Sequence, residues 1–182
     1  MMKYNRTKTT DQIAYRLLDL VSRKHLYDIT ITELISGPHI SRRTFYNHFN
    51  SLIDLINYTV QMVNENLNLN FLLKITDKNE LEKKTLEYLP EALYNNRDEI
   101  KIMYTTDLYG PWCELMFDTY LELIRKVEFD NLPANNINTK ITLTIFTYSI
   151  LSTIKVWISQ PIPGNANDLR SMLFRIIYNP KF

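Results

Sequence analysis

The residues best suited to a chemical task lie between Ser41 and Phe49, in the segment SRRTFYNHF. Its arginine, threonine, tyrosine, asparagine and histidine side chains are of types that can hydrogen-bond to phosphates or to base edges. Phe45 and Phe49 are four residues apart and therefore share one face of a helix. Such a helix buries its aromatic face and presents the polar side chains outward. This combination is typical of the recognition helix of a helix-turn-helix.

Short helices separated by tight breaks are expected to position this segment. Thr30 and Glu33 are spaced as a capping box, and Ser41 is suited to cap the next helix. Ser51 with Asp54 forms a further capping-box pattern at the start of a longer amphipathic helix. The spacing of apolar residues predicts four helices, over residues 11–25, 30–36, 41–49 and 51–74.

The remainder of the chain also has helical patterns. One segment, Ile141–Tyr148, alternates and is β-branched, which locally favours a strand. However, residues 138–160 contain no Gly or Pro, and this run of 23 residues is much longer than a usual strand, which favours a helix. We therefore predict an all-α protein with an N-terminal unit over 1–57 and a C-terminal unit over 58–182. Helices are predicted over 77–96, 98–108, 112–128, 138–159 and 168–178.

Composition narrows the class of protein further. The net charge is +1, but residues 1–50 carry +4 and all three histidines, whereas the remainder carries −3. A basic first third suggests a unit that binds a polyanion. The single cysteine, Cys113, can form no internal disulfide, which favours a reducing cytosol. The N-terminus lacks a signal-peptide pattern and no uninterrupted apolar run reaches membrane-spanning length, so we expect a cytoplasmic protein without a membrane partner.

The segment TITELISGPHISRRTFYNHF at 30–49, followed by SLIDL at 51–55, resembles the DNA-binding region of tetracycline-repressor-type (TetR family) regulators. The family pattern is roughly T-V-x-x-I-A-x-x-A-G-V-S-x-x-T-F-Y-x-H-F-x-S-K-x-x-L, and the similarity covers about residues 8–57. The resemblance implies a helix-turn-helix DNA-binding unit joined to a helical body that binds an effector and dimerises.

The resemblance also implies which residues contact DNA. Arg42 and Arg43 occupy positions that face base edges in the major groove, where arginine most often reads guanine. Thr44, Tyr46 and His48 match phosphate-contacting positions, and the helix opened by Ser41 favours a nearby phosphate. The predicted DNA-contacting residues are Thr30, Thr32, Ser41, Arg42, Arg43, Thr44, Tyr46, Asn47 and His48.

Three positions depart from the family pattern. His39 stands where the family has its turn glycine, and a left-handed conformation there is mildly costly for a non-glycine residue. Ile35 replaces a small alanine, and Leu52 replaces a lysine that touches phosphate. His39 and Leu52 motivate an alternative function, in which a protein of this fold has weakened DNA binding and is a co-activator or adaptor that acts through a protein partner.

In the C-terminal unit, the resemblance implies a cavity for a small, often apolar effector and a two-fold dimer that matches palindromic DNA. The candidate cavity residues are also explained by ordinary core packing. They are Tyr58, Met62, Tyr104, Trp112, Met116, Tyr120 and Phe146. The candidate dimer-interface residues are Ile150, Ile154, Trp157, Leu169, Leu173 and Ile176. The expected partners are therefore double-stranded DNA, a second copy of the chain and an unidentified small molecule.

Enzymatic chemistry has no support in the sequence. We find no nucleophile–base pair, no phosphate-binding loop and no metal-ligand cluster, so we expect neither an enzyme nor a bound cofactor. The histidines at 25, 39 and 48 have no acid or cysteine at ligand spacing, and we predict no metal. Cys113 has no Lys or His beside it in the sequence, which favours an inert thiol over a redox sensor.

Overall fold

The computed structural model describes residues 6–37, 39–128, 137–161 and 164–178, although the side chains at 120, 122, 124 and 126–128 are not described. Every regular element within these ranges is helical, which confirms the all-α prediction. The α-helices are α1 (Lys8–Val21), α2 (Ile31–Ser36), α3 (Arg42–His48), α4 (Leu52–Asn66), α5 (Lys78–Asn95), α6 (Arg97–Thr105), α7 (Tyr109–Glu128), α8 (Ile137–Ile158) and α9 (Ala166–Tyr178). Two short 3₁₀ turns are η1 (Leu26–Asp28) and η2 (Leu72–Lys74).

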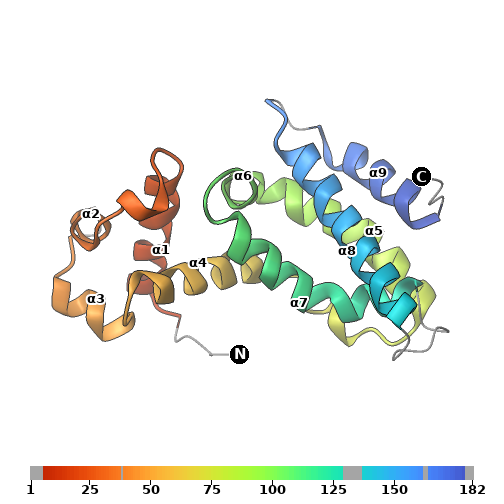
Figure 1. Cartoon of the computed structure of the whole chain (residues 1–182), viewed down its shortest axis with the longest axis horizontal. Helices are drawn as coiled ribbons and strands as arrows, with labels where there is room; N and C mark the ends of the chain where they lie inside the picture. The colour runs from red at the N-terminus through yellow and green to blue at the C-terminus, as the bar shows by residue number, and fades with distance from the viewer. Residues whose placement is uncertain (1–5, 38, 129–136, 162–163, 179–182) are drawn as a thin grey trace.

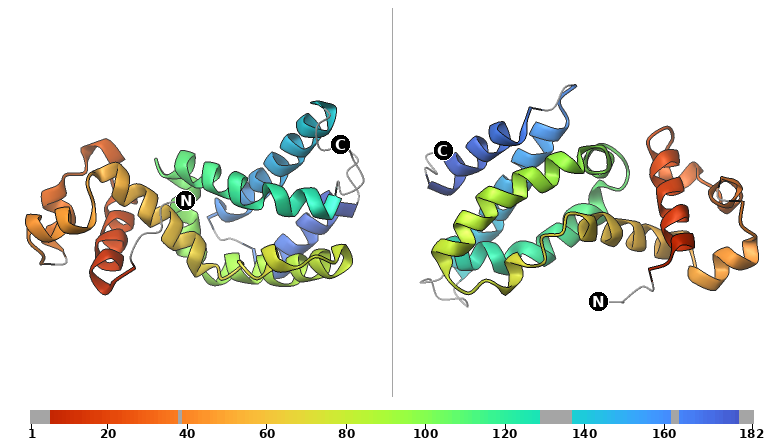
Figure 2. Two further views of the ribbon diagram at one scale, coloured as in Figure 1. Left: turned by 90° about the horizontal axis from the view of Figure 1, so that it is seen from below. Right: turned by 180° about the vertical axis from the view of Figure 1, so that it is seen from behind.

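The helices gather at the two ends of an elongated molecule. Helices α1, α2 and α3 lie at one end, and α5 to α9 lie at the other (Figure 1). Helix α4 runs from the first group to the second, packing on α1 at its beginning and on α6 and α7 further along (Figure 2). Because α6 and α7 both contact α4, a movement of either helix would act directly on the helix that follows α3.

The core at the α1–α3 end explains how α3 is held. The apolar residues of α1 recur at helical spacing and are buried, among them Ile13 and Leu17. Phe45 and Phe49 are fully buried, with ring centroids 5.6 Å apart, as their spacing predicts. Phe49 also contacts the Tyr58 ring of α4 at 5.3 Å. Burial of each phenylalanine contributes roughly 1.5–3 kcal/mol, so the aromatic face fixes how α3 is rotated.

The predicted helix caps are largely confirmed. Thr30 and Glu33 form the capping box at α2, with each backbone N–H donating to the other residue's side chain, at 3.0 and 3.3 Å. The Ser41 hydroxyl accepts a hydrogen bond from the Thr44 N–H at 3.0 Å. Ser51 caps α4 by accepting from the Asp54 N–H, but the Asp54 carboxylate accepts from the Asn50 N–H instead of completing a box with Ser51.

Some helix boundaries differ from the prediction. Helix α4 ends at Asn66, whereas the apolar spacing predicted a helix to Lys74. Asn68 adopts a left-handed conformation with φ of 53°, which ends the helix as asparagine commonly does. Helix α7 begins at Tyr109 and includes Gly110 and Pro111, because a proline in the first turn needs no N–H partner.

The segment over 137–158, for which a strand was considered, is the helix α8, with a mean hydropathy of 1.5 in its most apolar window. By length and composition it is the one helix in the described ranges that is apolar enough to cross a membrane. Its apolar runs are interrupted by Thr and Ser, which add little polarity, so the search for uninterrupted runs missed it. Helix α8 packs against α6, α7 and α9, and a core helix has the same composition, so this composition is weak support for a membrane.

Candidate functional site

The outward side of α3 collects the polar residues that the sequence singled out. Arg42, Arg43, Tyr46, Asn47 and His48 are exposed, and we call them the recognition face. Helix α3 contains no acidic residue. The structure therefore brings these five predicted side chains onto one exposed basic surface.

Three of the remaining four predicted DNA-contacting residues, Thr32, Ser41 and Thr44, lie beside the recognition face. The Arg42 guanidinium donates a hydrogen bond to the Thr32 hydroxyl at 2.7 Å, which joins α3 to α2. The half-buried Thr44 lies 2.9 Å from the Ser41 hydroxyl, so both belong to the start of α3. In the described part of the chain, Arg43 has neither a hydrogen-bond nor an ion-pair partner.

Thr30, also predicted to contact DNA, is engaged within the protein. Its hydroxyl donates to the Glu33 carboxylate at 2.8 Å, and that carboxylate also pairs with Lys24 at 2.6 Å. The Lys24 contact, together with the Thr30 hydrogen bonds, lowers the pKa of Glu33 to about 2. Glu33 is therefore ionised at neutral pH, and its negative charge is compensated by Lys24 next to the recognition face.

The turn between α2 and α3 uses a left-handed residue, as the comparison with the family pattern suggested. His39 has φ of 55°, in the region where glycine is favoured. Because a non-glycine residue pays for this conformation, the turn that precedes the recognition face carries a local backbone cost.

We predict that His39→Gly increases the free energy of unfolding by about 0.5–1 kcal/mol, because glycine adopts positive φ without the steric cost. Urea denaturation checks the change. Asn68→Gly is the matched control, with φ of 53° at the end of α4. Asparagine tolerates this region better than histidine, so its gain should be smaller. A loss of stability in His39→Gly would contradict the backbone explanation.

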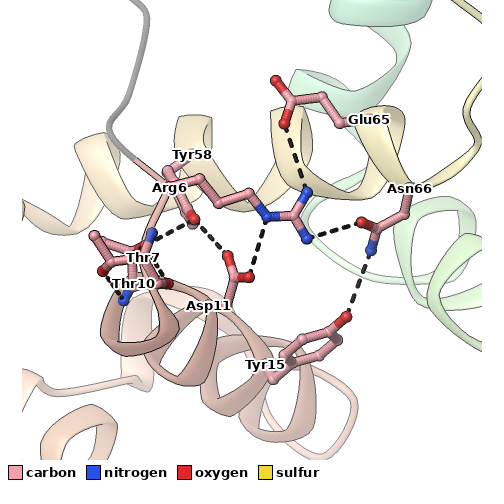
Figure 3. A network of polar contacts seen from close by, with 8 residues as sticks. All are labelled: Arg6, Thr7, Thr10, Asp11, Tyr15, Tyr58, Glu65 and Asn66. Carbon is pink, nitrogen blue, oxygen red and sulfur yellow. Dashed lines mark hydrogen bonds and ion pairs between the residues drawn. The ribbon is translucent and has the colours of Figure 1, made fainter.

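A polar network joins α1 to α4 (Figure 3). The buried Tyr58 hydroxyl donates to the Asp11 carboxylate at 2.5 Å and lies 2.9 Å from the Thr10 hydroxyl. Arg6 pairs with Asp11 at 3.1 Å and reaches Glu65 of α4 at 3.6 Å. Burial and the hydrogen bond to Asp11 raise the pKa of Tyr58 to about 12. Tyr58, predicted as a cavity residue, instead fixes α1 on α4.

Tyr58→Phe is expected to lower the free energy of unfolding by about 1 kcal/mol, since it removes one buried hydrogen-bonding hydroxyl and keeps the ring. Denaturant unfolding followed by circular dichroism measures the change. Tyr27→Phe serves as control because Tyr27 is 79% exposed and its hydroxyl has no hydrogen-bond partner among the described residues. An equal loss in both variants would show that the network adds nothing specific.

A second connection joins the two ends of the molecule. The Asp107 carboxylate, between α6 and α7, accepts a hydrogen bond from the Leu26 N–H at 2.8 Å and lies 3.3 Å from His25 Nδ1. The backbone N–H of Leu26 is the main reason that the pKa of Asp107 is lowered. The segment after α1 is therefore attached directly to the junction of α6 and α7.

An interior cavity of about 70 Å³ lies among α5, α7 and α8 and the segment that follows α4. Of the predicted cavity residues, Tyr104, Trp112 and Met116 line it. Met62 and Phe146 are buried but are not among the lining residues, and the side chain of Tyr120 lies outside the described part of the structure. The lining residues are Leu67, Leu69, Leu72, Thr85, Leu89, Leu93, Tyr104, Trp112, Met116, Leu123, Thr147, Ile150, Leu151 and Ile154.

Sequence reasoning missed Thr85 and all of the leucines that line this cavity. Thr85 had a signal, because it interrupts an otherwise apolar stripe at four-residue spacing on α5, formed by Leu81, Leu89 and Leu93. A threonine in an inward stripe indicates either a satisfied hydroxyl or a polar point in a binding site. The leucines carry no such signal, since core leucines and cavity leucines look identical in sequence.

The predicted dimer-interface residues need correction. Trp157, Leu169 and Leu173 are buried inside the protomer, and Ile150 and Ile154 line the interior cavity. Four of these residues are buried and Ile150 is half-buried, so together they supply little exposed surface for a second copy. Only Ile176 belongs to an open groove between α8 and α9, which we call the α8–α9 face. It is lined by Ile145, Tyr148, Ser149, Ser152, Thr153, Val156, Met172 and Ile176.

Comparison with known proteins adds no assignment. No protein-family model matches the chain, and no curated protein shows significant similarity to it. Within the described residues, no group of three or more His, Cys, Asp or Glu side chains is arranged to hold a metal ion. The features of the described structure that bear on function are α3, the interior cavity and the α8–α9 face.

Proposed function

We propose that the chain is a DNA-binding transcriptional regulator of the TetR type, which binds a palindromic duplex site as a homodimer. The observation that carries the proposal is the recognition face, which places Arg42 and Arg43 in the first turn of α3, exposed and without an acidic neighbour on that helix. Phe45 and Phe49 hold the opposite side of α3 in the core. A helix anchored in this way can enter a major groove and present its N-terminal residues to base edges.

Dimerisation through the α8–α9 face is part of the proposal. Ile145, Tyr148 and Val156 are more than half exposed on α8, and Met172 of α9 is 43% exposed. Several large apolar side chains on one face are typical of a surface that another protein covers. A second copy as the partner explains the palindrome, because a two-fold dimer presents two recognition helices about one turn of DNA apart, roughly 34 Å.

We also propose that the protein is a cytoplasmic repressor and that a ligand controls its DNA binding. The interior cavity supplies a place for a ligand. Helix α4 connects the cavity region to α1–α3, because it packs on α6 and α7 and is joined to α1 by the Tyr58 network. A change in the packing around the cavity would alter the position of α1 to α3 and thereby the spacing of two recognition helices in a dimer.

The salt dependence of duplex binding tests the proposal. We expect the logarithm of the association constant to fall linearly with the logarithm of salt concentration, with a slope of about −4 or steeper for a dimer, because several phosphate contacts release counterions. Fluorescence anisotropy with a labelled duplex measures this slope. The absence of binding at about 50 mM salt would contradict direct DNA binding.

A second candidate function is that of a co-activator or adaptor that binds a protein partner. Its support is Leu52, which is half-buried at the start of α4 where the family pattern has a phosphate-contacting lysine. Loss of one phosphate contact lowers affinity without abolishing it. The adaptor function is therefore favoured only if the anisotropy experiment shows no duplex binding.

A further inference from the structure

The interior cavity restricts the chemistry of any molecule it holds. Its lining residues are aliphatic, aromatic, methionine or threonine, and none carries a charge. A charged ligand would lose its hydration here without gaining an ion pair, which is strongly unfavourable. The cavity therefore selects an uncharged, largely apolar molecule.

Two residues that line this cavity each have a buried polar atom without a hydrogen-bond partner. These atoms are the Thr85 hydroxyl oxygen and Trp112 Nε1. Among the described residues, the one other buried side-chain polar atom without a partner is Trp157 Nε1, and Trp157 does not line the cavity. A buried indole N–H normally has an acceptor, and an unmet one is unfavourable. Two such atoms on residues of one cavity indicate that a ligand supplies the partner.

The nearest polar neighbour of Trp112 does not fill this role. Tyr104 lies edge-on to the indole, with ring centroids 6.2 Å apart, and the contact of its hydroxyl with Trp112 offsets part of the rise in the Tyr104 pKa that burial causes. This contact does not have the geometry of a hydrogen bond to Trp112 Nε1. Burial raises the pKa of Tyr104, so its hydroxyl remains neutral. The site therefore offers neutral hydrogen-bonding groups and no anion.

The size of the cavity sets a second condition for ligand binding. Its volume of about 70 Å³ is below the roughly 150 Å³ of an engineered cavity that binds benzene, so a ring-sized ligand must push the walls apart. The two polar atoms are covered by the carbon surface of the empty cavity. Separation of α5, which carries Thr85, from α7, which carries Trp112, would uncover both.

We propose that the interior cavity binds a small, uncharged, apolar molecule with one hydrogen-bond acceptor, such as a ketone, which accepts from Trp112 Nε1 and lies beside the Thr85 hydroxyl. The binding itself does not depend on DNA. Its regulatory meaning rests on the proposed function, because α7, one of the two helices that must separate, packs on α4 and α8.

The test uses the full chain without DNA and two probes of similar shape, cyclohexanone and methylenecyclohexane, which differ in having an oxygen or a CH₂ group. The indole N–H signals of the two tryptophans are followed by ¹H–¹⁵N NMR and assigned with Trp112→Phe and Trp157→Phe. We expect cyclohexanone to bind about tenfold more tightly than the alkene and to move the Trp112 signal but not that of Trp157.

Three variants test separately whether the Trp112 N–H and the Thr85 hydroxyl bind the ketone. Trp112→Phe should abolish the preference for the ketone, and Thr85→Val should reduce it, whereas Trp157→Phe, the matched control, should retain it. Equal affinity for both probes would overturn the role of the polar atoms, and no signal change with either probe at saturating concentration would overturn the site. Either result leaves the duplex-binding measurement unaffected, so failure here is distinct from failure of the DNA-binding proposal.

Discussion

Replacement of both Arg42 and Arg43 with alanine is expected to weaken binding to the preferred duplex by about a hundredfold or more. Each bidentate arginine–guanine contact provides roughly 1–3 kcal/mol of discrimination, and the two side chains are exposed on one turn of α3. Both replacements leave the buried Phe45 and Phe49 unchanged, so the variant should fold normally. Anisotropy titrations with the preferred and a scrambled duplex measure the loss.

The control for this variant removes two positive charges elsewhere. Lys83 and Arg97 are exposed on α5 and at the start of α6, away from the recognition face (Figure 1). Lys83→Ala/Arg97→Ala has the same net charge as the double arginine variant and should retain preference for the selected duplex. If the two variants lose the same affinity, the arginines act through net charge and α3 does not read the sequence.

The second large effect is expected at the α8–α9 face. Ile145→Glu/Val156→Glu should convert the dimer to monomers at micromolar concentration and lower affinity for a palindromic duplex by about a hundredfold. Both side chains are more than 60% exposed in the protomer, so folding tolerates the change. In a two-fold dimer the same substitutions bury four carboxylates without partners, which costs several kcal/mol. Sedimentation velocity measures the association directly.

Leu73→Glu/Tyr88→Glu is the matched control for the dimer variant. Both residues are exposed apolar side chains outside the α8–α9 face, and the charge change is identical. This control should remain dimeric and should bind the palindrome. A dimer that survives the substitutions at 145 and 156 would place the interface elsewhere.

The orientation of α3 was predictable because its large apolar residues and its charged residues lie on different sides of the helix. Phe45 and Phe49 can only face a core, and the arginines beside them can only face solvent, so one helical period fixes both sides. The caps were predictable for a related reason, since Thr30, Ser41 and Ser51 have side chains that satisfy the free N–H groups at a helix start. The left-handed conformation of His39 followed from the glycine at that position in the family pattern.

The orientation of α8 was not predictable in this way. Its residues are apolar on most faces, so the pattern does not indicate which side is inward. The prediction chose Ile154 and Trp157 for the dimer surface, whereas the packing of α6, α7 and α9 buries them and leaves Ile145 and Val156 outside. Contacts between helices decide this rotation, and a single sequence does not contain them.

Selection from a random duplex library at low salt, with the wild-type chain, determines whether α3 reads a DNA sequence. We expect enrichment of a palindrome whose half-sites are centred about 10 base pairs apart and contain guanine where Arg42 and Arg43 reach. Enrichment of no sequence by the folded, dimeric protein would contradict the claim that α3 reads DNA.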